Sequence, residues 1–284
     1  MQPLSRKKRL GYLALSFLLF LIIAPVAILY AKGYRLTEKF QITRTGGFYI
    51  SVGHSGAQIY INDSLAKETG IFQKGALVQN LKPGVYRIKV VKENLNSWEK
   101  ELPVFKETVT EARAFLLPLE PEITEITAFE IKKEEQGTST SLSKTTNIKN
   151  PQYALVTDLF GPKTIASSTG PKILNKLSAT RESDKVIVRW LGEKNGQPTY
   201  FCRKEECKNE IAVRAEENIN SFYFFPGRDD LIVFQSASGI FVAEIDDRSK
   251  QNIQPILKRP DLGLRVEENT IFIKEGKKFY FVTL

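Results

Sequence analysis

Hydrophobic and polar positions divide the chain into one long apolar run and many short alternating ones. The long run covers residues 10–31, LGYLALSFLLFLIIAPVAILYA, and contains no charged side chain. At 1.5 Å per residue, a helix of this length reaches about 33 Å, enough to cross the hydrocarbon core of a bilayer. Pro25 is tolerated in a helix of this kind. The pattern therefore predicts a transmembrane helix over residues 10–31, with the lipid membrane as its partner.

The charges beside this run predict its orientation. Four basic residues precede it directly: Arg6, Lys7, Lys8 and Arg9. By the positive-inside rule, residues 1–9 form a cytoplasmic tail and the C-terminal portion is extracytoplasmic. A cleaved signal peptide is the alternative, but its apolar region is usually shorter, and the segments PVA and LYA are poor cleavage sites. We therefore expect an uncleaved, single-pass anchor in the cell membrane.

After residue 36, short alternating runs indicate β-strands. Phe48, Ile50 and Val52 alternate with polar positions, and residues 57–62 repeat the pattern. Pro83 and Gly84 predict a turn before another alternating run, because proline presets φ and glycine accepts a positive φ. Residues 45–118 are thus expected to form a small antiparallel β-sandwich.

This region resembles the PEGA domain, a small extracytoplasmic β-sandwich module of prokaryotic surface proteins. The resemblance covers about residues 46–118 and depends on the strand-entry and turn residues Gly46, Gly47, Gly56, Ala57, Pro83 and Gly84. The sequence departs from the family where His54-Ser55-Gly56-Ala57 replaces the Pro-Glu-Gly-Ala tetrapeptide that names it. The resemblance implies an envelope interaction module without enzymatic activity.

Residues 119–150 have the composition of a linker followed by an exposed loop rich in Ser, Thr, Lys and Asn. Residues 151–284 again suggest β-hairpins, expected at 153–168, 185–203, 231–245 and 270–284. Their irregular spacing of about 40 residues is typical of four-stranded propeller blades. This length supplies three to four blades, the lower limit of a closed propeller. A small or incomplete propeller, a second sandwich, or a ring completed by a partner chain all remain open.

The basic composition does not indicate a nucleic-acid partner. The 284 residues carry 41 basic and 32 acidic side chains, a net charge of +9. Six of the basic residues and none of the acidic ones lie in residues 1–35, so the remainder is close to neutral. No basic stripe with interleaved aromatic residues follows.

The two cysteines, Cys202 and Cys207, are expected to form a structural disulfide in an oxidising compartment. Two free thiols are the alternative. Zinc binding is disfavoured, since zinc needs four ligands and the single histidine, His54, is about 150 residues away in sequence. The Cys-x₄-Cys spacing also differs from the Cys-x-x-Cys of redox dithiols.

Other chemically suggestive residues have structural explanations. His54 lacks the partners of a catalytic triad and is expected in an exposed turn. The segment GGFYISVG has neither the spacing nor the following helix of a phosphate-binding loop. Adjacent acids usually lie in solvated turns, and the aromatic residues are expected to pack in the β core rather than to stack on sugars. The acid pairs and aromatic residues concerned are Asp229-Asp230, Asp246-Asp247, Glu267-Glu268, Trp98, Trp190, Phe222, Tyr223, Phe224 and Phe225.

The sequence thus favours a membrane-anchored surface protein with a non-catalytic binding or structural role, whose partner is an envelope polymer or another surface protein. We expect no catalytic residue, cofactor or metal. Two alternatives belong to other classes. One is a propeller-based envelope hydrolase, which needs acids or a nucleophile converging in a central channel. The other is an extracytoplasmic sensor, which needs a membrane partner because residues 1–9 are too few for a signalling domain.

Overall fold

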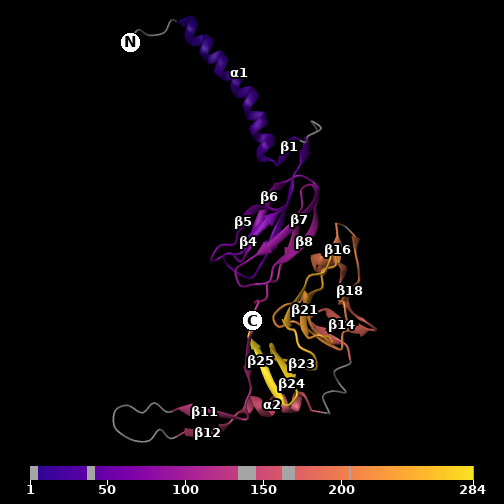
Figure 1. Cartoon of the computed structure of the whole chain (residues 1–284). Helices are drawn as coiled ribbons and strands as arrows, with labels where there is room; N and C mark the ends of the chain where they lie inside the picture. Colours follow the sequence, from indigo (N-terminus) through magenta and orange to yellow (C-terminus); the bar gives the residue numbers. More distant parts are fainter. Residues whose placement is uncertain (1–5, 37–41, 134–144, 162–169, 205, 284) are drawn as a thin grey trace, which may run out of the picture.

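A computed structural model describes residues 6–36, 42–133, 145–161, 170–204 and 206–283. Helix α1 (Arg6–Ala31) projects from one end of the molecule, and the β-structure follows it (Figure 1). None of the residues of α1 is buried, and Arg6–Arg9 form its exposed first turn. The helix is long and apolar enough to cross a membrane, a test that a signal sequence also passes.

The helix is joined to the β-structure by a short hairpin of β1 (Tyr34–Leu36) and β2 (Ile42–Arg44). Gly33 follows the helix with φ +80°, a conformation that glycine adopts without strain. Its carbonyl accepts hydrogen bonds from the backbone N–H of Thr45 at 3.0 Å and from Thr45 Oγ1 at 2.9 Å. The end of α1 is therefore hydrogen-bonded directly to the residue that precedes the next sheet.

A sandwich of two sheets follows, as the alternating pattern predicts. The three-stranded sheet has the order β6-β3-β9 and the four-stranded sheet the order β5-β4-β7-β8. Their bounds are β3 (Gly46–Ser51), β4 (Gln58–Ile61), β5 (Ser64–Glu68), β6 (Gly75–Leu81), β7 (Gly84–Val91), β8 (Trp98–Val104) and β9 (Val109–Arg113). One pair departs from the expected antiparallel arrangement: β3 and β9 are parallel. The core holds Phe48, Ile59, Ile88 and Trp98, all fully buried.

The C-terminal region contains three antiparallel four-stranded sheets, with orders β13-β14-β15-β18, β19-β20-β21-β22 and β10-β25-β24-β23. The first two are built from β13 (Lys172–Leu174), β14 (Leu177–Glu182), β15 (Lys185–Trp190), β18 (Glu210–Arg214), β19 (Ser221–Phe224), β20 (Leu231–Gln235), β21 (Ile240–Glu244) and β22 (Ile253–Leu257). The third contains β10 (Glu122–Glu125), β23 (Leu262–Glu267), β24 (Thr270–Glu275) and β25 (Lys278–Thr283). The β20–β21 and β24–β25 hairpins are those the sequence predicts. Propeller closure stays a prediction.

Two segments differ from the hairpins expected near them. Residues 151–159 form helix α2 (Pro151–Leu159) instead of the first strand of a hairpin. Asn150 caps this helix by accepting a hydrogen bond from the N–H of Gln152 at 2.9 Å, and Pro151 occupies the first turn, where it needs no donor. Strand β15 pairs with β14 and β18, while Thr199–Phe201 forms a single 3-10 turn, η3. A second short 3-10 turn, η2 (Lys194–Gly196), precedes it.

The expected linker over residues 119–150 also contains regular structure. Strand β10 follows the sandwich in the chain and pairs with β25, so the third sheet combines this one early strand with the three last strands. Strands β11 (Phe129–Lys133) and β12 (Thr145–Lys149) form a hairpin, and residues 134–144 of the expected loop lie outside the described residues. Because β10 is only four residues long and largely exposed, its pairing depends on the distant β25 rather than on a local pattern.

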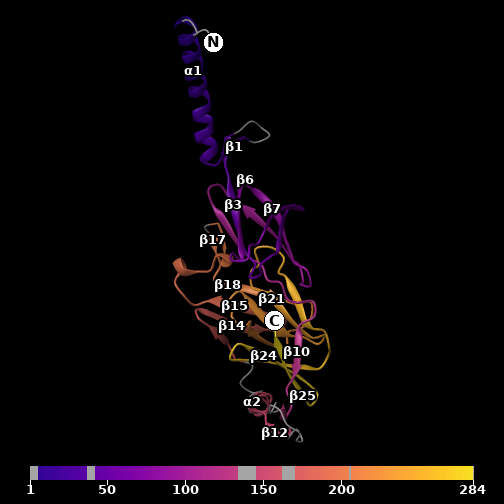
Figure 2. The ribbon, with the colours of Figure 1, turned by 90° about the vertical axis from the view of Figure 1, so that its left-hand side faces the viewer.

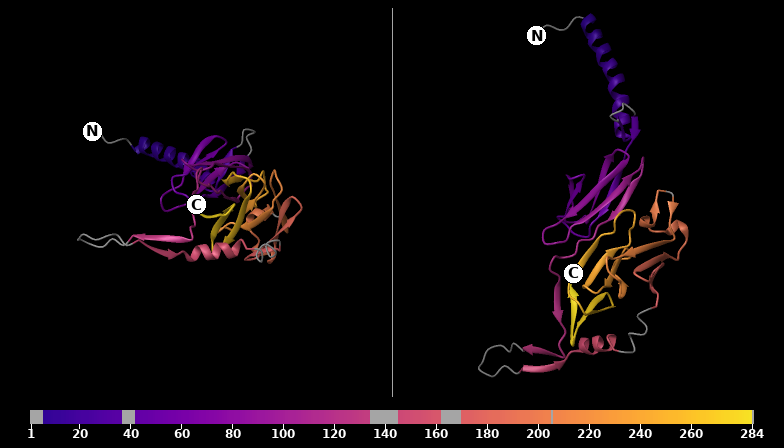
Figure 3. Two further views of the ribbon diagram at one scale, coloured as in Figure 1. Left: turned by 60° about the horizontal axis from the view of Figure 1, so that its bottom comes forward. Right: turned by 45° about the vertical axis from the view of Figure 1, so that its right-hand side comes forward.

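The sandwich and the C-terminal sheets pack against each other in all the views (Figures 2 and 3). One cluster of buried apolar side chains runs through both, from Phe48 and Trp98 to Leu231, Ile240 and Leu264. A second cluster lies between the first two C-terminal sheets, and a third joins α2 to the third sheet through Tyr153, Phe160 and Phe279. The contact between the sandwich and the C-terminal sheets creates the candidate site.

Candidate functional site: the groove between the two β-regions

A groove of about 620 Å³ runs between the sandwich and the C-terminal sheets. The sandwich lines one wall with the ends of β7, β8 and β9, and the C-terminal wall comes from the segments around residues 197–204 and 248–249. The lining residues are Val85, Glu101, Pro103, Phe105, Thr108, Val109, Thr110, Glu111, Gln197, Thr199, Cys202, Arg203, Lys204, Arg248 and Ser249. Exposed valines therefore lie close to side chains of both charges, a surface suited to an amphipathic partner.

A buried ion pair joins the sandwich to the C-terminal sheets. Lys100 on β8 is 2% exposed and Glu244 on β21 is equally buried. Lys100 Nζ donates to Glu244 Oε1 at 2.7 Å and to the carbonyl of Asp246 at 2.7 Å, and Asp246 Oδ2 lies 3.8 Å away. The ammonium group is thus surrounded by acceptors, which a buried charge requires.

The Glu244 carboxylate is also saturated with donors. Its Oε2 accepts from Trp98 Nε1 at 3.0 Å, and its Oε1 accepts from the N–H and Nδ2 of Asn252 at 2.7 and 2.8 Å. Burial raises the pKa of Glu244, and the charge of Lys100 opposes that rise. A carboxylate with all these donors is a structural link between the two β-regions, not a free base.

A second group of charges lies at the same interface. Arg113 of β9 forms ion pairs with Asp229 at 2.7 Å and with Asp230 at 3.4 Å, and Arg228 holds Asp230 at 2.6 Å. Arg248 Nη2 lies 2.9 Å from Asp246 and donates to the carbonyl of Glu111 at 2.7 Å.

The expectation of solvated acid pairs is therefore wrong for two of the three. Asp230 and Asp246 are buried and bound to arginines, whereas Glu267 and Glu268 are exposed. The difference arises because the interface buries Asp230 and Asp246, while Asp229 and Asp247 stay half-buried. Each of these four aspartates forms an ion pair with a lysine or arginine.

The outer edge of β8 is covered by side chains. Asn252 donates to the carbonyl of Glu99 at 2.8 Å and accepts from its N–H at 3.2 Å, as a neighbouring strand would. The N–H of Glu101 donates to Ser249 Oγ at 3.4 Å, and Gln254 donates to the carbonyl of Ser97, directly before β8, at 3.2 Å. Because Pro103 has no N–H to offer, this edge is protected from adding a further strand.

The predicted disulfide Cys202–Cys207 is confirmed, and it lies on the C-terminal wall of the groove. It joins β16 (Cys202–Arg203) to β17 (Glu206–Cys207), two strands too short to form a stable hairpin alone. The N–H of Lys208 donates to the carbonyl of Phe201 at 3.0 Å. The disulfide therefore keeps this wall in place.

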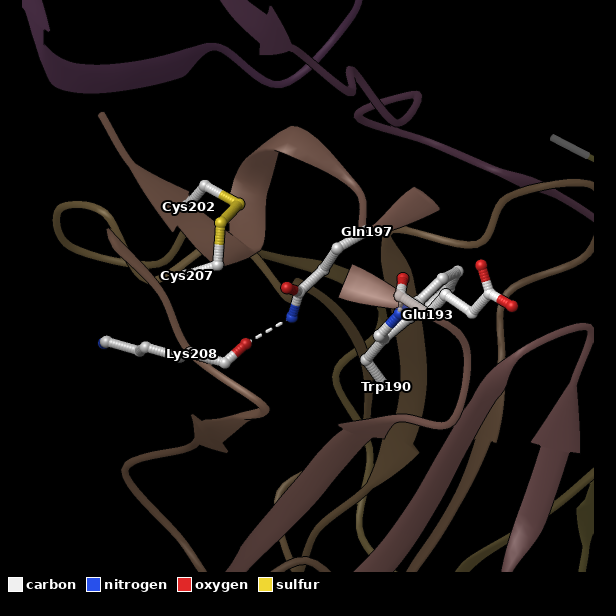
Figure 4. The surroundings of a disulfide bond; sticks show 6 residues. All are labelled: Trp190, Glu193, Gln197, Cys202, Cys207 and Lys208. Carbon is white, nitrogen blue, oxygen red and sulfur yellow. Dashed lines mark hydrogen bonds between the residues drawn. A yellow bond between two sulfur atoms is a disulfide. The ribbon is translucent and has the colours of Figure 1, made fainter. Parts of the chain in front are cut away.

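One polar atom of the wall has no partner. Figure 4 shows Gln197 beside the disulfide, with its Nε2 donating to the carbonyl of Lys208. The Oε1 of Gln197 is buried and accepts no hydrogen bond within the described part of the chain. A buried acceptor without a donor costs free energy.

The turn and strand-entry residues of the sandwich have distinct roles. Gly46 and Gly47 lie in β3 where the chain is crowded: a Cβ there would come within 2.1 Å of the Phe105 carbonyl and 2.4 Å of the Val78 carbonyl, respectively. Gly56 has φ +66°, and Ala57 is fully buried. Pro83 and Gly84 are exposed at the β6–β7 turn. These residues shape the sandwich and are not in the groove.

His54 is half-buried rather than in an exposed turn. Its Nε2 lies 3.2 Å from the carbonyl of Leu116, which packs over the turn from a distant part of the chain. Burial lowers the pKa of His54, and the charge of Lys92 lowers it further. Within the described residues, His54 belongs to no cluster of metal-ligating side chains. Its contacts are structural.

The aromatic residues mostly pack in the core, as expected. Trp98, Phe222 and Phe224 are buried, while Tyr223 and Phe225 are half-buried against the core cluster. Trp190 donates its Nε1–H to the Glu193 carbonyl at 2.9 Å beside the disulfide wall (Figure 4).

Sequence reasoning missed Lys100 and Glu244, the buried ion pair that joins the two β-regions. The burial of Lys100 could have been predicted from the sequence, because it occupies an inward position of the alternating run Trp98, Lys100, Leu102 and Val104. A charge at such a position requires a buried partner. The identity of that partner, about 145 residues later, has no sequence signal.

No family model and no curated protein matches this chain. Among solved structures, one titled "AfRom2 CNH domain" matches over 77% of this chain and 69% of that chain, with 15% sequence identity and a TM-score of 0.26. That similarity is too low to inform the fold or the function.

Proposed function

We propose that this protein is a single-pass, membrane-anchored binding protein of the cell envelope, whose extracytoplasmic β-regions hold a polymer or protein partner in the groove without chemical conversion. The observation that carries the proposal is α1, an apolar helix of 26 residues with no buried residue. Because the apolar side chains of this helix stay exposed among the described residues, they require another apolar environment, and a bilayer supplies it.

The position of the β-structure supports the anchor. The cations Arg6–Arg9 precede the apolar segment, which favours a cytoplasmic N-terminus. The disulfide Cys202–Cys207 is consistent with an oxidising compartment on the other side. The PEGA-like sandwich would then be the membrane-proximal module that carries the groove.

The chemistry of the groove supports binding over catalysis. The buried acids Glu244 and Asp246 of the interface are neutralised by lysine or arginine, and the exposed surface of the groove combines Val85 and Val109 with Arg203, Lys204 and Glu101. Such a surface suits a hydroxyl-rich polymer or a peptide segment.

Protease digestion of intact spheroplasts tests the anchor. We expect residues 36–284 to be digested from outside while an N-terminal tag is protected, and carbonate washing to leave the full chain in the membrane. Protection of the C-terminal regions in intact cells, with digestion only after lysis, would reject the proposed topology.

Capture of purified envelope polymer or surface proteins by the detergent-solubilised full chain tests the groove. The substitution Val109→Glu introduces a charge on the groove wall and should weaken capture about tenfold. Leu191→Glu is the matched control, because Leu191 is similarly exposed and is not a groove residue. Equal capture by both variants would show that the groove is not the binding surface.

A further inference from the structure

Five basic side chains surround the exit of α1. Lys32 follows the helix directly, Arg35 and Arg44 lie on β1 and β2, and Lys82 and Lys106 lie in the β6–β7 and β8–β9 turns. We name these five residues the basic collar. They come from four separate segments, so their proximity is produced by the fold and not by a run of basic sequence.

Hydrogen bonds hold these segments at the helix end. Arg35 Nη1 donates to the carbonyl of Tyr30 at 2.9 Å, and its Nη2 donates to Asn80 Oδ1, next to the β6–β7 turn, at 2.9 Å. The N–H of Glu107, in the β8–β9 turn, donates to the carbonyl of Thr45 at 3.0 Å. Figures 1 and 2 show this end of the sandwich directly below the helix.

The basic collar has an excess of positive charge. Arg44 forms an ion pair with Glu107. Among the described residues, the other four collar residues have no ion-pair partner, and the three lysines are exposed. Residues 37–41 add one acidic and one basic side chain to the sequence and leave the sum unchanged. The cations are therefore available to an anionic partner.

Aromatic and apolar side chains accompany the cations. The Arg35 guanidinium lies 3.6 Å from the ring centroid of Tyr30, and that of Arg44 lies 4.9 Å from Tyr34. Ile42 on β2 is 63% exposed beside them. Tyrosine next to arginine and lysine at the end of an apolar helix is typical of the membrane–water interface.

We propose that the basic collar binds the anionic phospholipid headgroups of the bilayer that α1 crosses, so that the sandwich stands on the membrane in a fixed orientation. This proposal rests on the anchoring part of the proposed function. Because Lys32 is one residue beyond the apolar helix, the collar lies at headgroup depth. Its distance from the lipid phosphates is then within the Debye length of roughly 10 Å, so salt screens the attraction only in part. Each lysine or arginine at an anionic surface contributes about a fivefold gain in binding constant.

The test uses the full chain in nanodiscs of neutral phosphatidylcholine or of a mixture with anionic phosphatidylglycerol. A spin label at Thr108→Cys, an exposed position of the β8–β9 turn, reports depth by its accessibility to oxygen and to a water-soluble nickel chelate. In anionic discs we expect the label at headgroup depth. Neutral lipid or 1 M salt should move it into bulk water.

Matched variants separate the collar from general charge effects. The triple substitution Lys32→Gln, Lys82→Gln and Lys106→Gln should lower the ratio of membrane-bound to free orientations about 100-fold in anionic discs. The control triple Lys176→Gln, Lys194→Gln and Lys277→Gln removes the same charge from exposed positions of the C-terminal region and should change nothing.

The proposal would be overturned if the label had the same accessibility in neutral and anionic discs. It would also be overturned if the triple substitution of the collar lysines left the depth of the label unchanged. The two proposals fail in distinguishable ways. A chain that is embedded in the disc while its label stays in water overturns the collar alone. A chain recovered outside the discs in every lipid overturns the anchor and, with it, the collar.

Discussion

Lys100 Nζ and Glu244 Oε1 lie 2.7 Å apart, and the two residues belong to different β-regions separated by 144 positions in the chain. Trp98, two residues before Lys100, donates to the other oxygen of the same carboxylate. Lys100 and Trp98 of the sandwich therefore both bind one carboxylate of the C-terminal region, which also accepts from Asn252. These directional bonds make the interface specific as well as apolar.

Lys100→Met should reveal how the interface depends on these bonds. The substitution keeps most of the side-chain volume but leaves the Glu244 carboxylate buried without its cation. Breaking a buried pair in this way costs about 3–5 kcal/mol in the free energy of unfolding. Urea unfolding of the detergent-solubilised chain, monitored by tryptophan fluorescence, measures the loss because Trp98 contacts the same carboxylate.

Two further variants control this prediction. Lys67→Met on β5 removes an exposed lysine that has no ion pair among the described residues, and it should cost less than about 0.5 kcal/mol. Lys100→Met combined with Glu244→Met should recover much of the lost stability, since two apolar groups can replace a buried pair. A loss for Lys100→Met no larger than that for Lys67→Met would contradict the interpretation.

Replacing both Cys202 and Cys207 with serine should loosen the groove wall. The disulfide closes a loop of six residues, for which the chain-entropy relation gives about 2 kcal/mol. Because β16 and β17 contain two residues each, faster amide exchange should be confined to residues around 200–209. Hydrogen exchange followed by mass spectrometry checks this expectation, and reduction of the native protein should reproduce it. Full alkylation of both cysteines in the unreduced native protein would contradict it.

Much of the fold follows from local sequence pattern. The alternation predicted the burial of Phe48 and Ile50 on β3 and of Val52 directly after it. The β20–β21 hairpin was predictable because its strands are rich in β-branched and aromatic residues around a short turn. The disulfide was predictable because its cysteines are close in sequence and the compartment was inferred independently from the anchor.

Non-local pairing could not be predicted in the same way. Strand β10 is short and polar, and it becomes a strand because β25 offers it an edge. Residues 151–159 contain apolar positions that suggested a strand. The segment nevertheless forms a helix, because Asn150 caps its start and Pro151 suits its first turn. The groove joins residues near position 100 to residues near positions 200 and 248, a proximity that only the folded chain defines.

The single histidine makes the stability of the chain depend on pH in a defined window. Burial lowers the folded-state pKa of His54 below the ordinary histidine value of about 6.5, so the unfolded chain binds more protons once the pH falls below about 6.5. The free energy of unfolding should therefore fall as the pH is lowered from 7 toward 5, and the loss should end below the folded pKa. His54→Gln should flatten this part of the curve. Urea unfolding at several pH values provides the measurement, and identical slopes for both proteins would refute the assignment.

Gly46 and Gly84 offer the sharpest contrast between packing and turn formation in the sandwich. A Cβ at Gly46 would lie 2.1 Å from the carbonyl oxygen of Phe105 and 2.7 Å from that of Thr108, and backbone atoms cannot move away as a flexible side chain can. At Gly84 the nearest atom, on the ring of Tyr86, is 3.8 Å away.

Gly46→Ala should therefore destabilise the protein by about 3 kcal/mol or more, the upper range for inserting one methyl group into a packed site. Gly84→Ala should change stability by less than about 1 kcal/mol. Thermal unfolding followed by circular dichroism compares the two, and equal midpoints would show that β3 and the β8–β9 turn can separate. Such freedom would also weaken the Glu107–Thr45 hydrogen bond that holds the sandwich at the end of α1, because Gly46 and Thr45 are adjacent in the chain.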